Sequence, residues 1–129
     1  MKAIVATVLL FGLAMVGNAD VTLYVSPTGN DAWSGRLPEA NAAQTDGPVA
    51  TLTRARDAVR AAKAQGEPVT VLLRGGRYFV EETIVFTPED GGTEAAPVTW
   101  ASYPGETPVL IGGRVIAGFT PQDNGTLVA

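Results

Sequence analysis

The sequence contains no cysteine and no histidine. Without cysteine no disulfide can form, so folding depends on the packing of the chain's own core or on a larger fold around it. Without histidine, Ser-His-Asp and Cys-His catalysis and the usual zinc sites are excluded from this chain. Carboxylates are therefore the groups to consider first for any catalytic role.

Basic residues are also scarce, since 9 Lys and Arg stand against 13 Asp and Glu, for a net charge of -4. They form no patch, so binding that follows a phosphate backbone is disfavoured. No stretch after residue 19 is apolar enough to cross a membrane. We expect neither nucleic acid nor a membrane among the partners of the mature chain, and we expect a monomer without cofactors.

Residues 1–19 have the pattern of a secretory signal peptide. Lys2 supplies the positive start, residues 3–16 are apolar and uncharged, and residues 17–19 are small where a signal peptidase reads them. The apolar run is shorter than the ~20 residues that a membrane span needs. The sequence therefore predicts cleavage before Asp20 and a secreted, periplasmic or cell-surface protein.

One stretch of the sequence occurs twice. PVTVLLRGG at residues 68–76 returns as PVTWASYPG at residues 97–105, 29 positions later. Each copy is a β-branched run between a proline and a glycine turn, and a fixed period of ~20–50 residues is typical of repeat architectures. The repeat favours a coil of stacked strands over a closed globule. The expected strands are residues 20–25, 69–73, 78–80, 83–86, 98–102, 109–111 and 114–119.

A single helix is expected over residues 51–65. Its apolar residues recur at helical spacing, and Gly66 and Pro68 stop it. Asp57 and Arg60 stand at i, i+3 and are expected to pair. The apolar residues at helical spacing form a stripe along one side of this helix: Leu52, Ala55, Val59 and Ala62. Before the helix, residues 31–48 predict a long loop pinned by its two large apolar side chains, Trp33 and Leu37.

Several of these segments together resemble the N-terminal part of secreted right-handed parallel β-helix proteins, which are pectate-lyase-like in architecture. The matching segments are residues 23–31 (LYVSPTGND), 47–48 with 51–52 and 55–60, 73–78 (LRGGRY), 88–93 (PEDGGT), and 103–106 (YPGE) with 112–113. The resemblance runs from Leu23 to about Phe119. One departure is Gly91, where such proteins usually have serine. The resemblance implies a mainly-β fold with an N-terminal cap over residues 20–66 (strand, loop and helix) and the first rungs of the β-helix over residues 67–129.

Many proteins of this kind are glycoside hydrolases or polysaccharide lyases with catalytic groups on later rungs. The resemblance therefore implies the N-terminal part of a secreted protein that acts on complex polysaccharides, more as a hydrolase than as a lyase. It implies no catalytic residue in this chain, and the residues themselves suggest no metal site. Because an uncapped solenoid end exposes apolar side chains and strand edges, the chain is expected to begin a longer protein.

Two other interpretations stay open. The first is a non-catalytic surface or adhesion β-helix, whose rungs serve as scaffold or as a carbohydrate-binding wall. The second is a complete small secreted β-protein. One β-helix scaffold hosts several functions, so fold alone does not decide between them.

The carboxylates offer no catalytic pair by spacing. Glu81 and Glu82 are the only adjacent acids, and neighbours on a strand point to opposite faces. We expect the acidic side chains to be solvated, and Asn30, Asp31 and Asp90 to cap turns rather than bind calcium. The remaining acids considered are Asp46, Asp57, Glu89, Glu94 and Glu106.

Aromatic residues supply one candidate binding residue. Trp33 lies in the polar loop, where it is either a hydrophobic pin, the interpretation favoured here, or a platform for a sugar ring. Trp100 lies within an expected strand and is expected to pack in the core or between rungs. Trp33 is therefore the only ligand-binding residue that the sequence suggests.

Overall fold

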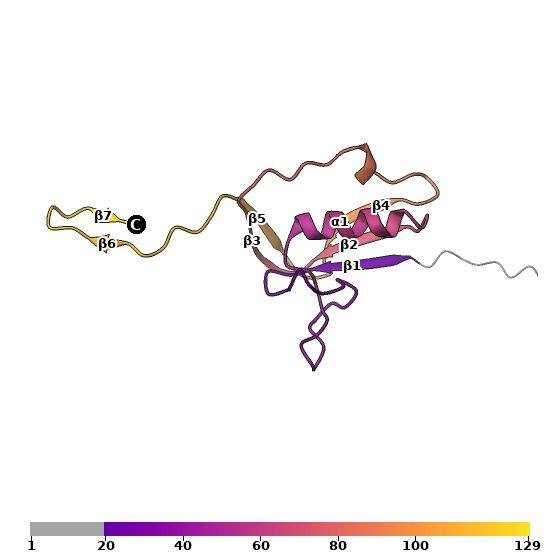
Figure 1. Ribbon diagram of the computed structural model, residues 1–129, viewed down its shortest axis with the longest axis horizontal. Coiled ribbons are helices and arrows are strands. Elements are labelled where there is room, and N and C mark those ends of the chain that lie inside the picture. The colour runs from indigo at the N-terminus through magenta and orange to yellow at the C-terminus, as the bar shows by residue number, and fades with distance from the viewer. Residues whose placement is uncertain (1–19) are drawn as a thin grey trace, which may run out of the picture.

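The computed structural model describes residues 20–129 (Figure 1). The predicted signal peptide, residues 1–19, lies outside this range. The elements are β1 (Val21–Val25), α1 (Leu52–Lys63), β2 (Val69–Leu73), β3 (Gly76–Val80), the 3-10 turn η1 (Pro88–Asp90), β4 (Val98–Ser102), β5 (Pro108–Gly112), β6 (Thr120–Pro121) and β7 (Leu127–Val128). A mainly-β fold with one helix is confirmed, and none of the sheets in residues 20–129 is closed. Within the same range, no helix has the length and apolarity needed to cross a membrane.

Three parallel strands form the main sheet, in the order β1-β2-β4. The two copies of the repeated sequence lie side by side, with Val69 opposite Val98 and Leu73 opposite Ser102. In the same way β1 pairs with β2, starting from Val21 opposite Val69. The predicted stacking of the repeat is therefore confirmed for this pair of strands.

A second parallel sheet pairs β3 with β5, from Gly76 opposite Pro108 to Val80 opposite Gly112. The chain passes from β2 through a short turn into β3, and from β4 through a turn into β5. We call β2–β3 the first coil and β4–β5 the second coil. Both sheets thus contain one strand from each coil, and the two coils stack in register.

The core lies between the main sheet and α1. Residues of β1 and β2 alternate between buried and half-buried positions, as expected for strands with one inward face. The predicted apolar stripe of α1 is entirely buried: Leu52, Ala55, Val59 and Ala62. Thr51 caps the helix by accepting a hydrogen bond from the backbone N–H of Arg54 at 3.1 Å. This packing closes the β1 side of the structure.

Two predicted strands do not form. Residues 83–87 run without strand pairing beside α1, where Arg56 donates a hydrogen bond to the carbonyl of Val85 at 3.1 Å. Residues 114–119 also lack strand structure, and the short antiparallel hairpin β6–β7 follows them and projects away from the coils (Figure 1). High β-propensity in these segments is not enough, because no neighbouring strand among residues 20–129 offers them a ladder.

Two predicted contacts are also wrong. Leu37 is exposed, so it does not pin the long loop. Arg60 does not pair with Asp57 but with Asp90 in η1, and Asp57 contacts Arg56 instead. Arg60 pairs with Asp90 rather than Asp57 because Asp90 is buried and both of its carboxylate oxygens accept hydrogen bonds from the guanidinium.

Burial falls off sharply at the second coil. Trp100 is half-buried and meets Phe86 edge to face, with ring centroids 5.6 Å apart, so its predicted core contact is confirmed. Phe86 and Leu110 nevertheless remain 53% and 55% exposed. Together with Leu73 and Val80 they line an apolar groove of about 590 Å³, which extends from Leu52 of α1 to residues of the second coil. The β4–β5 side of the structure is therefore open.

Candidate functional site

A polar cleft of about 400 Å³ lies between the long loop and the turns of the two coils. Trp33, the candidate from the sequence, forms part of its wall. We call this polar cleft the Trp33 cleft. Its lining comes from three places in the chain: Ser26 and Thr28 after β1, Trp33, Pro38, Glu39, Ala40 and Pro48 from the loop, and Arg74, Gly75 and Glu106 from the turns.

Hydrogen bonds to two aspartates give the loop its shape. Asp46 accepts from the backbone N–H and the hydroxyl of Ser34, at 2.8 and 2.9 Å, and from the N–H of Gly47 at 2.9 Å. The Ser34 donors, with Gly47, hold the pKa of Asp46 below its ordinary value. Asp31 accepts from the N–H groups of Ala50 and Thr51, at 2.8 and 2.9 Å. The loop is therefore an ordered cover fastened to the start of α1.

The predicted turn-capping roles fit only partly. Asn30 accepts from the backbone N–H of Ala32 at 2.9 Å, which is the expected local turn. Asp31 instead bonds residues 19 and 20 positions away. It therefore connects the loop to the helix, a role that local spacing does not reveal.

Trp33 packs closely against Gly47. A Cβ atom on Gly47 would stand 2.7 Å from two carbons of the indole ring, which is closer than real contacts allow. Trp33 is half-buried, and its indole N–H has no hydrogen-bond partner among residues 20–129. The side chain thus packs against the loop as the predicted pin, and it also lines the cleft.

Arg74 and Glu106 line the cleft and bind each other. The guanidinium donates from Nε to Oε2 and from Nη2 to Oε1, both at 2.9 Å, and also donates to the carbonyl of Pro38. It lies 4.6 Å from the centre of the Tyr103 ring. Glu106 also accepts from the N–H of Gly75 at 2.6 Å. The hydrogen bonds from Arg74 and Gly75 lower the pKa of Glu106, and those to Glu106 raise the pKa of Arg74.

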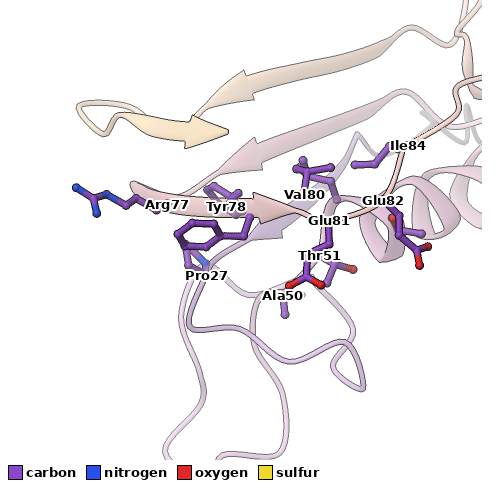
Figure 2. A pocket seen from close by; sticks show the side chains of 12 residues that line it. Pro27, Ala50, Thr51, Arg77, Tyr78, Val80, Glu81, Glu82 and Ile84 are labelled. Carbon is purple, nitrogen blue, oxygen red and sulfur yellow. The ribbon is translucent and has the colours of Figure 1, made fainter. Parts of the chain in front are cut away.

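A second groove, of about 490 Å³, lies between the start of α1 and β3 (Figure 2). Glu81 and Glu82 line it together with Arg77, Tyr78 and Thr51. Figure 2 shows the two glutamate side chains diverging and Arg77 extending away from the groove. Both glutamates are exposed, as predicted. They do not form the facing pair of carboxyl groups that glycoside hydrolysis requires.

Asp90 overturns the expectation that the acids are all solvated. It is 6% exposed and accepts from Nε and Nη2 of Arg60 at 2.6 and 2.8 Å, and from the N–H of Thr87 at 2.7 Å. The hydrogen bonds from Arg60 and then Thr87 hold the pKa of Asp90 far below its ordinary range. Lys63 donates to the carbonyls of Glu89 and Gly91. Asp90 therefore caps the η1 turn, as predicted, and it also fastens η1 to α1 through Arg60.

The sequence carried a signal for this fastening. Arg56, Arg60 and Lys63 follow one another at i, i+4 and i+7, so they lie along one side of the helix. All three hold residues of the segment between β3 and β4. A basic stripe on a helix followed by an acidic turn is the pattern that indicates such a contact.

Residues 20–129 contain no group of three or more His, Cys, Asp or Glu side chains that could hold a metal ion. Comparison with known proteins finds no family model, no curated protein and no solved structure that matches the chain. The resemblance to β-helix proteins therefore stays a prediction.

Proposed function

We propose that this chain forms the N-terminal cap and the first coils of a right-handed parallel β-helix, within a secreted protein that acts on complex polysaccharides. The observation that carries the proposal is the in-register parallel stacking of β2–β3 on β4–β5. Parallel strands joined by a crossover connect with right-handed sense in about 98% of cases, which supports the handedness. The polysaccharide substrate, with hydrolysis ahead of elimination, rests on the sequence resemblance.

The two sides of the structure support different roles. On one side, β1, α1 and the long loop bury the core, as a cap must do. On the other, β4 and β5 are edge strands, and the apolar groove is lined by the exposed side chains of Phe86 and Leu110 and by the half-buried Trp100. The occupant that we propose for this groove is a third coil, parallel and in register with the second, because the first two coils already stack in that manner.

Catalysis in this proposal belongs to residues outside this chain. Glu81 and Glu82 diverge, while Asp90 and Glu106 are each engaged by an arginine. A carboxylate neutralised by a guanidinium is a poor general acid, because its pKa falls and it stays ionised. The role of this chain is then to start and close the coil, and to hold what binds at the cap.

The test compares residues 20–129 with the product of the complete gene on neutral and uronate-containing polysaccharides. New reducing ends without unsaturated products indicate a hydrolase, and unsaturated uronate absorbance indicates a lyase. We expect product from the complete protein and none from residues 20–129. Cleavage by residues 20–129 alone would contradict the proposal.

The alternative is a non-catalytic β-helix that serves as an adhesion scaffold or as a carbohydrate-binding wall. The Trp33 cleft favours the binding form of this alternative, because it offers an aromatic ring and polar groups without a catalytic pair. Retention of the complete protein on insoluble polysaccharide, with no released product, would select it.

A further inference from the structure

We propose that the Trp33 cleft binds one ring of a neutral oligosaccharide. The inference deepens the proposed function, on which it rests for the presence of polysaccharide, and it assigns a binding site to the cap. The volume of about 400 Å³ lies in the range of small-ligand sites. The lining combines one aromatic wall with several polar groups, which is the mixture that a ring of hydroxyls and C–H faces requires.

Trp33 contributes the apolar contact and one donor. Its ring packs closely against Gly47, and this contact limits how far the ring can turn when a ligand binds. Its indole N–H has no partner among residues 20–129 and is free to donate to a hydroxyl oxygen. Because the contact with Gly47 restricts the ring before binding, less side-chain entropy is lost when a ligand binds.

Three other side chains contribute hydrogen-bonding groups. Glu39 is 79% exposed, and its one charged contact is Arg74 at 3.7 Å, so its carboxylate can accept from a ligand hydroxyl. The hydroxyls of Ser26 and Thr28 lie 3.0 Å apart and line the same cleft. Hydroxyl groups both donate and accept, as sugar hydroxyls do.

The charge of the cleft selects a neutral ligand. Arg74 is the one basic residue in the lining, and Glu106 already neutralises it at 2.9 Å. Glu39 adds a second carboxylate, which meets the same arginine only at 3.7 Å, so the lining of one arginine and two glutamates carries a net charge of -1. A uronate, sulfate or phosphate group would meet repulsion there.

The experiment is isothermal titration of the purified chain with cellohexaose, xylohexaose and mannohexaose, and with oligogalacturonate as the acidic probe. We expect at least one neutral hexaose to bind and the acidic probe to bind at least tenfold more weakly. Trp33→Phe keeps a ring but loses the donor, and Glu39→Gln loses the charged acceptor. Each is expected to weaken neutral binding by up to about tenfold, the value of one hydrogen bond.

Leu37→Ala is the matched control, because Leu37 lies in the same loop, is exposed and does not line the cleft. We expect it to bind as the wild type does. Absence of neutral binding, equal binding of the acidic probe, or unchanged binding by both cleft variants would overturn the proposal.

The proposed coil can be tested separately by oxidising a Thr70→Cys, Thr99→Cys variant, because these two residues face each other across β2 and β4. If the cross-link forms but no sugar binds, only the proposal for the Trp33 cleft is contradicted. If the cross-link does not form, the proposed coil is contradicted.

Discussion

Glu106 binds the guanidinium of Arg74 through two hydrogen bonds of 2.9 Å, although the two residues stand 32 positions apart. Arg74 follows β2 in the first coil, and Glu106 follows β4 in the second. The same carboxylate accepts from the N–H of Gly75 at 2.6 Å. One side chain therefore fastens the turns of successive coils to each other, beside the strand pairs that join them.

The first prediction concerns this link. Glu106→Gln removes the charge while it keeps the shape, so the charge-assisted bonds from Arg74 are weakened. We expect the melting temperature to fall by several degrees in thermal unfolding. Glu39→Gln is the control, because Glu39 meets the same arginine only at 3.7 Å and is largely exposed. Equal melting temperatures for Glu106→Gln and the control would count against the fastening role.

The second prediction concerns the capped core. Leu23 lies in β1 and is 2% exposed. Leu23→Ala should lower the free energy of unfolding by about 2–5 kcal/mol, since it removes buried methyl groups and leaves a cavity. Chemical denaturation measures the change. Leu37→Ala, which alters an exposed side chain, should change the free energy of unfolding by less than about 0.5 kcal/mol. Comparable losses of stability in the two variants would mean that the core lies elsewhere.

The third prediction concerns acid. Arg60 and Thr87 hold the pKa of Asp90 below the value of 3.8 that it has without them. The unfolded chain therefore takes up this proton at a higher pH than the folded chain, and the stability that Asp90 contributes is present above about pH 4 and lost as the pH falls further. Asp90→Asn should flatten the acid loss of stability in thermal unfolding followed from neutral to acid pH. A variant curve parallel to the wild-type curve would refute this assignment.

The fourth prediction concerns alkali. The Tyr78 hydroxyl donates to the carbonyls of Val25 and Arg74, at 2.9 and 2.7 Å, and burial raises its pKa from 10.0 to about 12. A raised pKa means that its contribution is complete below about pH 10 and is lost as the pH climbs toward 12. Tyr78→Phe should cost about 1 kcal/mol at neutral pH and should flatten the alkaline loss.

Tyrosinate absorbance checks the alkaline prediction directly. In the wild type, one tyrosine should ionise together with unfolding, well above the pH at which exposed tyrosines ionise. In Tyr78→Phe this late step should be absent. If the step persists in the variant, another tyrosine is responsible for it and the burial of Tyr78 does not govern alkaline stability.

Much of the fold could be predicted from local pattern. β2 and β4 begin and end where expected, because a proline precedes each run and each run opens with the β-branched pair Val-Thr. The buried face of α1 also follows from spacing, and its cap is the threonine that precedes the stripe. The strand predicted over residues 83–86 does not form, because Arg56 binds the carbonyl of Val85 and keeps this segment beside α1. Strand propensity carries no information about a partner so distant in sequence.

The candidate site was predicted only in part. Trp33 stood out as a lone aromatic in a polar loop, and it does line a cleft. Arg74 and Glu106 reach that cleft only because the two coils stack, so no local pattern places them there. The burial of Asp90 was missed for a similar reason, since its partner Arg60 lies 30 positions earlier.

The open side of the second coil gives the most direct test of the proposed third coil. Tyr103 donates its N–H to the carbonyl of Leu73. Because bonding directions alternate along a parallel strand, the amides of Trp100 and Ser102 point away from β2, toward the free edge of β4. They are the groups that a third coil would engage.

The measurement is hydrogen exchange at the amides of Trp100 and Ser102, in residues 20–129 alone and in the product of the complete gene. We predict fast exchange in the first protein and protection on the order of a hundredfold or more in the second. Equally fast exchange in both proteins would contradict a third coil on this edge, and with it the proposal that this chain begins a longer β-helix.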